Sequence, residues 1–248
     1  MCCHRVIVLT GEILVNAEDS YAIVRIARPE KMNSVTKTMM ESFYDSVSRI
    51  TNEPNVRAII FTGEGRRSFS AGFDMDTIQG LKGQEARDFF KLLERTMRLI
   101  RQNRTCITVA AVNGYAIGFG AMLALACDFR VFSSNAIFRL PETELSVFPG
   151  AGAASYLLQL VGPSRAKDIL LTTRKVSAKE ALQIGLADMV VNQEDIMERS
   201  IGFVQELLKK DPKILIRTKT LIDGMTGKEL SEAEELETVY LDEWLREL

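Results

Sequence analysis

Two short glycine-bearing segments contain the backbone chemistry that acyl-group reactions use. They run over 68–75 (SFSAGFDM) and 113–120 (NGYAIGFG), each downstream of a run of apolar residues. Backbone N–H groups in such loops can converge and stabilise negative charge on a carbonyl oxygen, which is an oxyanion hole. A simpler interpretation is also open, because glycines at these positions equally permit tight turns and close helix packing.

A third segment, 138–150, carries a candidate acid or base. Glu142 follows a proline in an apolar setting, and a carboxylate there would have a raised pKa. Glu144, two residues further on, is expected to face solvent. The stretch 150–155 (GAGAAS) nearly matches the pattern of dinucleotide sites, but Pro149 precedes it, and the helices that follow do not alternate with strands. A nicotinamide site is therefore disfavoured.

Imidazole and metal chemistry are disfavoured by the histidine content. The sequence holds one histidine, His4, which is far from these segments, so a Ser-His-Asp or Cys-His mechanism lacks its base. Cys2, Cys3 and His4 are consecutive, whereas thiolate chelates usually space their ligands by two or more residues. We expect no metal. Catalysis would then rest on carboxylates, backbone dipoles, Tyr, Lys or Ser.

The composition excludes several classes of function. The 248 residues include 31 Lys+Arg, 33 Asp+Glu and 46% apolar residues, as in ordinary globular proteins. A net charge of −2 gives no basic surface for nucleic acid, and no apolar run approaches the length of a membrane-spanning helix. The apolar run 6–9 is too short for a signal peptide core. Four cysteines are too few for a disulfide framework, so we expect a cytoplasmic protein.

Hydrophobic patterning predicts the elements that must position the three segments. Apolar runs predict strands over 13–15, 21–26, 56–61, 107–112 and 129–132. Helical spacing predicts helices over 36–50, 84–102 and 118–127. Strands that alternate with helices indicate parallel α/β layers. After residue 150 we expect helices over 155–161, 164–172, 177–184, 193–210, 212–224 and 229–248, with one strand at 188–191.

With these spacings the chain resembles the enoyl-CoA hydratase/isomerase (crotonase) superfamily from about Ile13 to its C-terminus. The matching segments are RPEKMNSVT (28–36), SFSAGFDM (68–75), AAVNGYAIGFGAMLALACDFRVF (110–132), LPETELSVFPGAGAASYL (140–157) and AKEALQIGLADMVV (178–191). The resemblance implies an α/β fold with a crotonase-type ββα spiral core over 1–190, of which 1–11 are frayed. It also implies a C-terminal helical trimerisation region over 191–248, packed on the core or on a neighbouring subunit.

The resemblance further implies an acyl-CoA thioester substrate. Coenzyme A would be part of the substrate, so no cofactor is expected. The implied partners are other copies of the chain, in a homotrimer or dimer of trimers, with no nucleic acid or membrane partner. The N–H groups of Phe73 and Phe119 would form the oxyanion hole, with Glu142 as acid/base. The residues expected to line the substrate path are Lys31, Met32, Ser34, Ser70, Ala71, Asp74, Met75, Gly118, Met122, Pro141 and Gly150.

Two departures from the family pattern bear on the reaction. Family hydratases place Gly where this chain has Phe119, and a first catalytic Glu where it has Met122. The backbone donor survives the first change, but an aromatic ring is expected to narrow or reshape the acyl pocket. A thioether cannot accept a proton, so Met122 disfavours hydration and favours the shift of a double bond from Δ3 to Δ2 by one carboxylate.

Two alternatives stay open beside the isomerase. One is a hydratase in which another group replaces the missing carboxylate. The other is a non-catalytic acyl-CoA-binding homologue. At single residues, too, ordinary structural roles compete with functional ones. Met122 would then be core packing, and Asp74 would cap its loop or the following turn.

Overall fold

The computed structural model describes the backbone of residues 5–8 and residues 13–247. The predictions on Cys2, Cys3 and His4 lie outside these residues. The strands are β1 (Arg5–Val8), β2 (Ile13–Ala17), β3 (Tyr21–Ile26), β4 (Ala58–Gly63), β5 (Ser68–Ser70), β6 (Ile107–Val112), β7 (Tyr115–Ile117), β8 (Phe129–Ser133), β9 (Ile137–Arg139), β10 (Val176–Ser177) and β11 (Met189–Val191). The helices are α1 (Lys37–Ile50), α2 (Met75–Gly80), α3 (Gly83–Arg101), α4 (Phe119–Ala126), α5 (Ala153–Thr172), α6 (Ala178–Gln183), α7 (Ile196–Leu208), α8 (Pro212–Met225) and α9 (Leu230–Leu245), with 3-10 turns η1 (Pro29–Lys31) and η2 (Gln193–Asp195).

The strands form two sheets. The larger has the order β1-β2-β3-β4-β6-β8-β11, antiparallel from β1 to β3 and parallel from β3 onward. The smaller has the order β10-β9-β7-β5, in which β5, β7 and β9 run parallel. Three strands of the larger sheet, β4, β6 and β8, are each followed by a short strand of the smaller sheet and then by helix. These repeats, β4-β5-α3, β6-β7-α4 and β8-β9-α5, are the expected ββα spiral.

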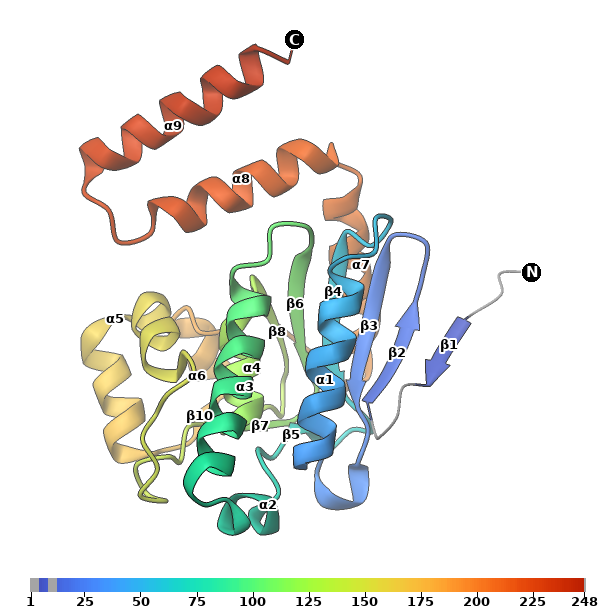
Figure 1. Ribbon diagram of the computed structural model, residues 1–248, viewed down its shortest axis with the longest axis vertical. Helices are drawn as coiled ribbons and strands as arrows, with labels where there is room; N and C mark the ends of the chain where they lie inside the picture. Colours follow the sequence, from blue (N-terminus) through green and yellow to red (C-terminus); the bar gives the residue numbers. More distant parts are fainter. Residues whose placement is uncertain (1–4, 9–12, 248) are drawn as a thin grey trace.

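Helices cover both faces of the larger sheet because its central strands are buried on both sides. In β4, Ile59 and Phe61 pack in the main core with α1, α3 and α4, whereas Ile60 packs in a second cluster beneath α7. Figure 1 shows α1 and α3 in front of the sheet and α7 behind it. The predicted helix after Thr36 is confirmed, since the Thr36 hydroxyl accepts a hydrogen bond from the Met39 N–H and caps α1.

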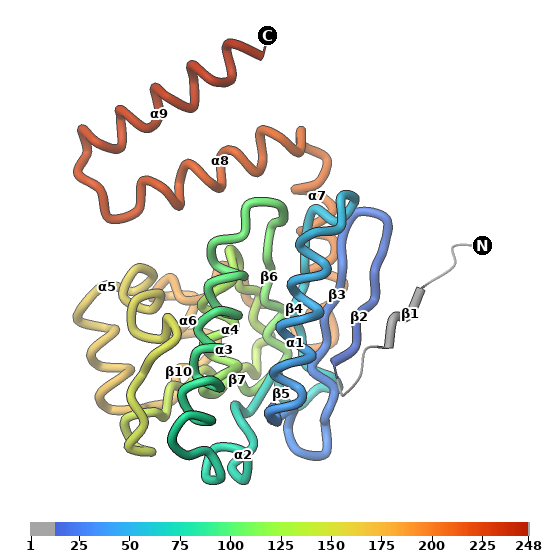
Figure 2. The backbone as a smooth tube through the Cα atoms, viewed as in Figure 1, coloured from blue at the N-terminus to red at the C-terminus, as the bar shows by residue number. Residues whose placement is uncertain are grey.

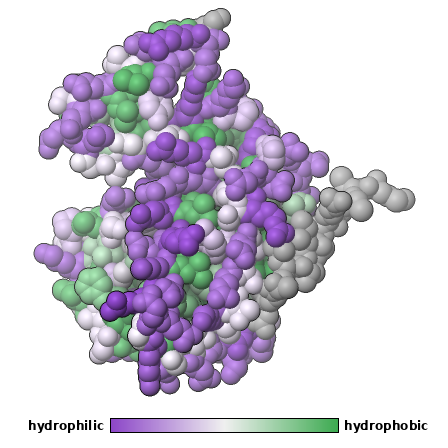
Figure 3. All heavy atoms as spheres, viewed as in Figure 1, coloured by the Kyte–Doolittle hydropathy of each residue, from purple (hydrophilic) through white to green (hydrophobic). Residues whose placement is uncertain are grey.

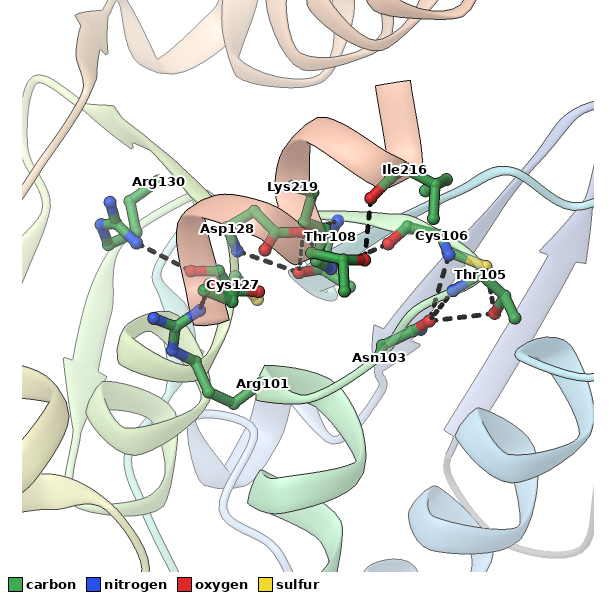
Figure 4. A network of polar contacts seen from close by, with 12 residues as sticks. Arg101, Asn103, Thr105, Cys106, Thr108, Cys127, Asp128, Arg130, Ile216 and Lys219 are labelled. Atoms are coloured by element: carbon green, nitrogen blue, oxygen red, sulfur yellow. Dashed lines mark hydrogen bonds and ion pairs between the residues drawn. The ribbon is translucent and has the colours of Figure 1, made fainter. Parts of the chain in front are cut away.

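The C-terminal helices α8 and α9 form a hairpin beyond one end of the sheet, as the tube in Figure 2 shows. Lys219 on α8 fastens this hairpin to the core. Its Nζ donates to Asp128 Oδ2 at 2.7 Å and to the Cys106 carbonyl oxygen at 2.9 Å (Figure 4). Asp128 Oδ2 also accepts hydrogen bonds from the Thr108 N–H and hydroxyl. The carboxylate therefore ties β6, the α4–β8 connection and α8 together.

Between α8 and the body of the molecule lies a cleft of about 620 Å³, lined by α5 residues such as Leu160 and α8 residues such as Ile214 and Ile222. The space-filling view shows the C-terminal helices standing off from the body at the left (Figure 3). Within the described residues, no helix combines the length and apolar character needed to cross a membrane.

Candidate active site

Three neighbouring parallel strands deliver the three candidate catalytic residues. β5 ends at Ser70 and leads to Phe73, β7 ends at Ile117 and leads to Phe119, and β9 leads to Glu142. Because β7 lies between β5 and β9, the Phe119 segment lies between the other two. The carboxyl ends of parallel strands meet at one edge of a sheet, which is where ligands bind in open α/β structures.

The first backbone donor is held by hydrogen bonds on both sides. The Gly72 carbonyl accepts from the Val35 N–H at 2.8 Å, and the Asp74 N–H donates to the Val35 carbonyl at 2.9 Å. Phe73 lies between these two bonds, and its own N–H has no acceptor among the described residues. The loop is thus rigid while one N–H stays available to a ligand.

The second donor opens a buried helix. Phe119 is the first residue of α4, so its N–H has no intrahelical acceptor and lies at the positive end of the helix dipole. Gly118 before it has φ 51° and ψ −113°, a conformation that requires glycine. The Gly118 N–H donates to the Arg139 carbonyl at 3.0 Å, which ties this turn to the end of β9.

The two donor segments approach each other closely. A Cβ built on Gly72 would lie 3.8 Å from the Phe119 nitrogen and 3.1 Å from the Ile117 carbonyl oxygen. A Cβ built on Gly118 would lie 3.8 Å from the Gly72 Cα. Both glycines have positive φ, so a side chain at either would strain the turn and crowd the other loop. The arrangement can present two N–H groups to one oxygen atom.

The Phe119 ring lies in the core, in contact with other aromatic rings. The residue is 1% exposed, and its ring packs edge-on against Phe43 of α1, with ring centroids 5.7 Å apart. The ring also packs against Phe73, with ring centroids 5.2 Å apart. Phe73 in turn meets Phe89 of α3 at 4.9 Å. The ring of Phe119 therefore fills the core between helices. Its effect on the acyl pocket stays a prediction, and the half-buried Phe73 is the more accessible ring.

Glu142 is buried beside the turn that begins α4. It is 6% exposed, and its Oε1 lies 3.5 Å from a Cβ built on Gly118. Its Oε2 is buried without a hydrogen-bond partner among the described residues. Burial raises the pKa of Glu142, and a hydrogen bond from its own backbone N–H opposes this in part. Such a carboxyl takes up a proton more readily than an exposed glutamate does.

Met122 lies one helical turn from Gly118, and its N–H donates to the Gly118 carbonyl at 2.9 Å. Residues four apart share a helix face, so Met122 lies on the face of α4 that Gly118 turns toward Glu142. The side chain belongs to the main core and is nearly buried. Its thioether offers no proton acceptor for an acid/base step.

Several residues expected along the substrate path lie in two loops that are bonded together. The Ala71 N–H donates to the Met32 carbonyl at 3.0 Å, and the Ser70 hydroxyl donates to the Asn33 carbonyl at 2.8 Å. Lys31 is exposed, and Ser34 is nearly buried. Ser70 is fully buried and its hydroxyl holds the two loops together, so its place along a substrate path stays a prediction.

The remaining expected residues divide between structural and exposed positions. Asp74 caps α2 and pairs with Arg28 at 2.8 Å, and the Arg28 guanidinium lowers the pKa of Asp74. The capping alternative is thereby confirmed. Met75 is exposed at the start of α2, Pro141 is buried beside Glu142, and Gly150 is half-buried in the loop before α5. No group of three or more metal-ligand side chains occurs among the residues that the structure describes.

One set of interactions near Glu142 was not foreseen. The Arg139 guanidinium pairs with the Glu144 carboxylate, and its Nε donates to the Thr173 carbonyl at 2.7 Å. Glu144 is exposed, so the solvent-facing prediction is confirmed, but it did not include this ion pair. Thr173 lies 34 residues along the chain from Arg139, and no short motif links the two.

Comparison with known proteins decides which family this site belongs to. The family model for enoyl-CoA hydratase/isomerase matches residues 16–246. The chain belongs to the enoyl-CoA hydratase/isomerase family. A crotonyl-CoA hydratase of Syntrophomonas wolfei is 38% identical over 198 residues, covering 80% of this chain and 76% of the relative.

Solved structures of this family share the fold. The enoyl-CoA hydratase of Bacillus anthracis superposes with a TM-score of 0.89 at 30% identity, covering 94% of this chain and 90% of that one. A Thermobifida fusca protein whose crystal structure holds acetoacetyl-CoA gives a TM-score of 0.87 at 28% identity, covering 96% of each chain. The predicted α/β crotonase fold with a helical C-terminal region is confirmed.

Proposed function

We propose that this protein binds an enoyl-CoA thioester and moves its double bond from Δ3 to Δ2, with Glu142 as the single acid/base. The observation that carries the proposal is one buried carboxylate at the junction of the two N–H donors, with a methionine on the facing turn of α4. Membership of the enoyl-CoA hydratase/isomerase family supports the thioester substrate.

In the proposed mechanism the thioester oxygen accepts hydrogen bonds from the N–H groups of Phe73 and Phe119. Glu142 removes a proton from C2, and the electron pair moves into the thioester to give a dienolate. The two amides and the α4 dipole stabilise the oxygen charge as it develops. Glu142 then returns its proton to C4, the double bond forms between C2 and C3, and the enzyme is regenerated.

The environment of Glu142 suits both halves of this cycle. A carboxyl whose pKa is raised by burial is a stronger base than an exposed glutamate. After it has taken the C2 proton, the neutral form is favoured in the same apolar surroundings, so the proton is retained until C4 is ready. The buried Met122 side chain supports this by keeping water from the carbonyl region.

A hydratase is the second candidate, and the name of the Syntrophomonas relative favours it. Hydration must orient a water molecule, deprotonate it and protonate C2, which two carboxylates usually share. Glu142 would have to perform these steps alone or with a group other than residue 122. Loss of one of two acid/base groups typically costs about a hundredfold in rate.

Labelled water separates the two reactions. Purified protein is given 3-enoyl-CoA and, separately, 2-enoyl-CoA in heavy-oxygen water, and the products are followed by mass spectrometry. We expect double-bond migration without labelled oxygen from 3-enoyl-CoA. Rapid uptake of labelled oxygen into product from 2-enoyl-CoA would overturn the isomerase proposal and establish the hydratase.

The Glu142→Gln variant tests the acid/base assignment and the non-catalytic alternative. We expect turnover to fall by about a thousandfold or more, because no other carboxyl replaces it. Binding should persist, seen as a rise in Tm when a CoA thioester is added. Turnover retained in the variant removes Glu142 from the mechanism. A wild-type protein that is stabilised by CoA thioesters without converting them is the binding homologue.

We also propose assembly as a homotrimer or a dimer of trimers through the C-terminal helices. α9 carries exposed apolar residues, among them Val239, Leu241 and Trp244, which a monomer would leave in water. Light scattering coupled to size-exclusion chromatography should give a mass of three or six chains. A monomeric mass at micromolar concentration would contradict the assembly while leaving the isomerase proposal standing.

A further inference from the structure

An ion pair closes around the loop that carries Glu142. Arg139 is the last residue of β9, and its guanidinium pairs with the Glu144 carboxylate, five residues along the chain. The two residues flank Glu142 on either side. Two backbone hydrogen bonds hold the turn that contains Glu142. The Leu145 N–H donates to the Pro141 carbonyl at 3.0 Å, and the Val147 N–H donates to the Glu142 carbonyl at 2.8 Å.

Thr173 anchors this ion pair to the C-terminal end of α5. Its carbonyl accepts from Arg139 Nε at 2.7 Å. Its hydroxyl lies 2.9 Å from Glu144 Oε2 and 2.8 Å from the Thr172 carbonyl oxygen, and it donates its one proton to one of these two acceptors at a time. Thr173 is 6% exposed and adopts φ 52°, so a buried and conformationally constrained residue meets both partners. At the same time the Arg139 carbonyl accepts the Gly118 N–H. Arg139 therefore contacts both the loop of the base and the turn of the oxyanion donor.

We infer that Arg139, Glu144 and Thr173 are positioning residues that hold Glu142 at the Gly118 turn for proton transfer. The inference rests on the proposed role of Glu142 as the acid/base. We name these three residues the β9 clasp.

The clasp is needed because the carboxyl itself is weakly held. Glu142 Oε2 has no hydrogen-bond partner among the described residues, so backbone placement of the loop sets the position of the carboxyl. Residues 143–146 are exposed, and packing alone does not fix their side of the turn. A displacement of about 1 Å at a reacting group can cost about a hundredfold in rate.

An ordinary exposed ion pair makes a different prediction. Such pairs contribute about 0–1 kcal/mol to stability and leave catalysis unchanged. The nearby pair between Arg174 and Glu180 is an internal control, because it is partly exposed, joins the segment after α5 to α6 and does not flank Glu142. Arg174 also pairs with Asp168 of α5.

Four variants test the clasp. Glu144→Gln removes the charge partner, and Thr173→Val removes the hydroxyl while preserving the branched shape. Thr173→Ser restores the hydroxyl, and Glu180→Gln is the control. We expect kcat to fall about tenfold in the first two with KM changed less than about twofold, and we expect near wild-type kcat in the last two.

A second readout does not depend on turnover. Carboxyl carbon NMR with labelled glutamate, assigned by the signal lost in Glu142→Gln, follows the titration of Glu142 in the folded protein. In Glu144→Gln the pKa of Glu142 should move toward the ordinary glutamate value as water enters the loosened loop. Unchanged kcat and unchanged Glu142 titration in Glu144→Gln would overturn the clasp, as would an equal loss of kcat in Glu180→Gln.

The experiments can refute the isomerase proposal and the clasp proposal independently of each other. Wild-type protein that converts neither enoyl-CoA refutes the isomerase, and the NMR titration then still decides whether the clasp places Glu142. Wild-type turnover that is lost in Glu142→Gln but unaffected in Glu144→Gln and Thr173→Val supports the acid/base and refutes the clasp.

Discussion

The rings of Phe73 and Phe119 lie with their centroids 5.2 Å apart and their planes tilted by 45°. These are the two residues whose N–H groups we propose as donors to a ligand oxygen, and they are joined by side-chain packing as well as by backbone proximity. Phe43 and Phe89 extend the contact to α1 and α3. The spacing of the two amides thus depends on the packing of an aromatic cluster in the core.

Truncation of the Phe119 ring tests this dependence. Phe119→Ala should lower the free energy of unfolding by about 3–5 kcal/mol, because it leaves a cavity among buried rings. Turnover should fall as well, since the first residue of α4 loses its anchor. Denaturant unfolding measures the first effect. The control is Phe90→Ala, which removes a 40% exposed ring from the edge of the same cluster and should cost far less. Equal costs would contradict the packing argument.

The pH dependence of turnover follows from the raised pKa of Glu142. The base must be ionised, so kcat/KM should rise with pH, and the midpoint of its acid limb should lie above the ordinary glutamate value of about 4.3. Initial rates across the acid range measure this. A midpoint at the ordinary value would show that burial does not act on the ionisable group of the free enzyme.

Stability should show the same shift with a defined sign. A carboxyl with a folded-state pKa above its unfolded value stabilises the fold fully while it is neutral and loses that contribution as pH rises through the folded pKa. Glu142→Gln stays neutral throughout. The difference in Tm between variant and wild type should therefore move in favour of the variant as pH rises above the ordinary glutamate pKa of about 4.3. A difference that is constant with pH would contradict the raised pKa.

A carboxylate at position 122 should alter the choice of reaction. Met122→Glu places an acid on the face of α4 that meets Gly118, so a water molecule would gain a second polar partner near Glu142. We expect the ratio of hydration to isomerisation to rise about tenfold, read from labelled oxygen in the products. Met122→Gln is a polar control without a proton-accepting carboxylate. A similar rise in that variant would assign the effect to polarity alone.

The ion pair beneath α8 should contribute strongly to stability. Lys219→Met leaves the Asp128 carboxylate buried without its cation, at a cost of about 3–5 kcal/mol. Hydrogen exchange should increase first along α8, because Lys219 joins that helix to the core. Lys213→Met, on the same helix but largely exposed, is the matched control. Equal effects on unfolding would indicate that burial of the pair is unimportant.

The sequence predicts the central elements well for a physical reason. The six residues of β6 and of β4 are all buried, and such apolar runs carry a strong signal. The helices α1 and α3 have clear apolar faces and lie within one residue of their predicted bounds. The break within α5 was also predicted, since separate helices were expected over 155–161 and 164–172, and Gly162 between them has a non-helical φ of 75° and ψ of 170°.

The small sheet could not be found in the same way. β5, β7 and β9 have three residues each, which is too few to show an alternation of apolar and polar residues. The sequence around them also resembles glycine-rich and polar loops. Their parallel order is what brings Phe73, Phe119 and Glu142 together. The site residues were therefore named from family resemblance, whereas the clasp at Thr173 depends on a contact between distant segments that no local pattern encodes.

Each of the three candidate groups lies in a different ββα repeat. In the proposed mechanism, the first two repeats would stabilise the negative charge through main-chain N–H groups, which no side-chain substitution deletes. The third provides the titratable group through a side chain on a loop, which one codon can exchange. Substitutions in residues 140–150 would therefore change the acid/base group, and with it the reaction, while the two proposed backbone donors stay in place.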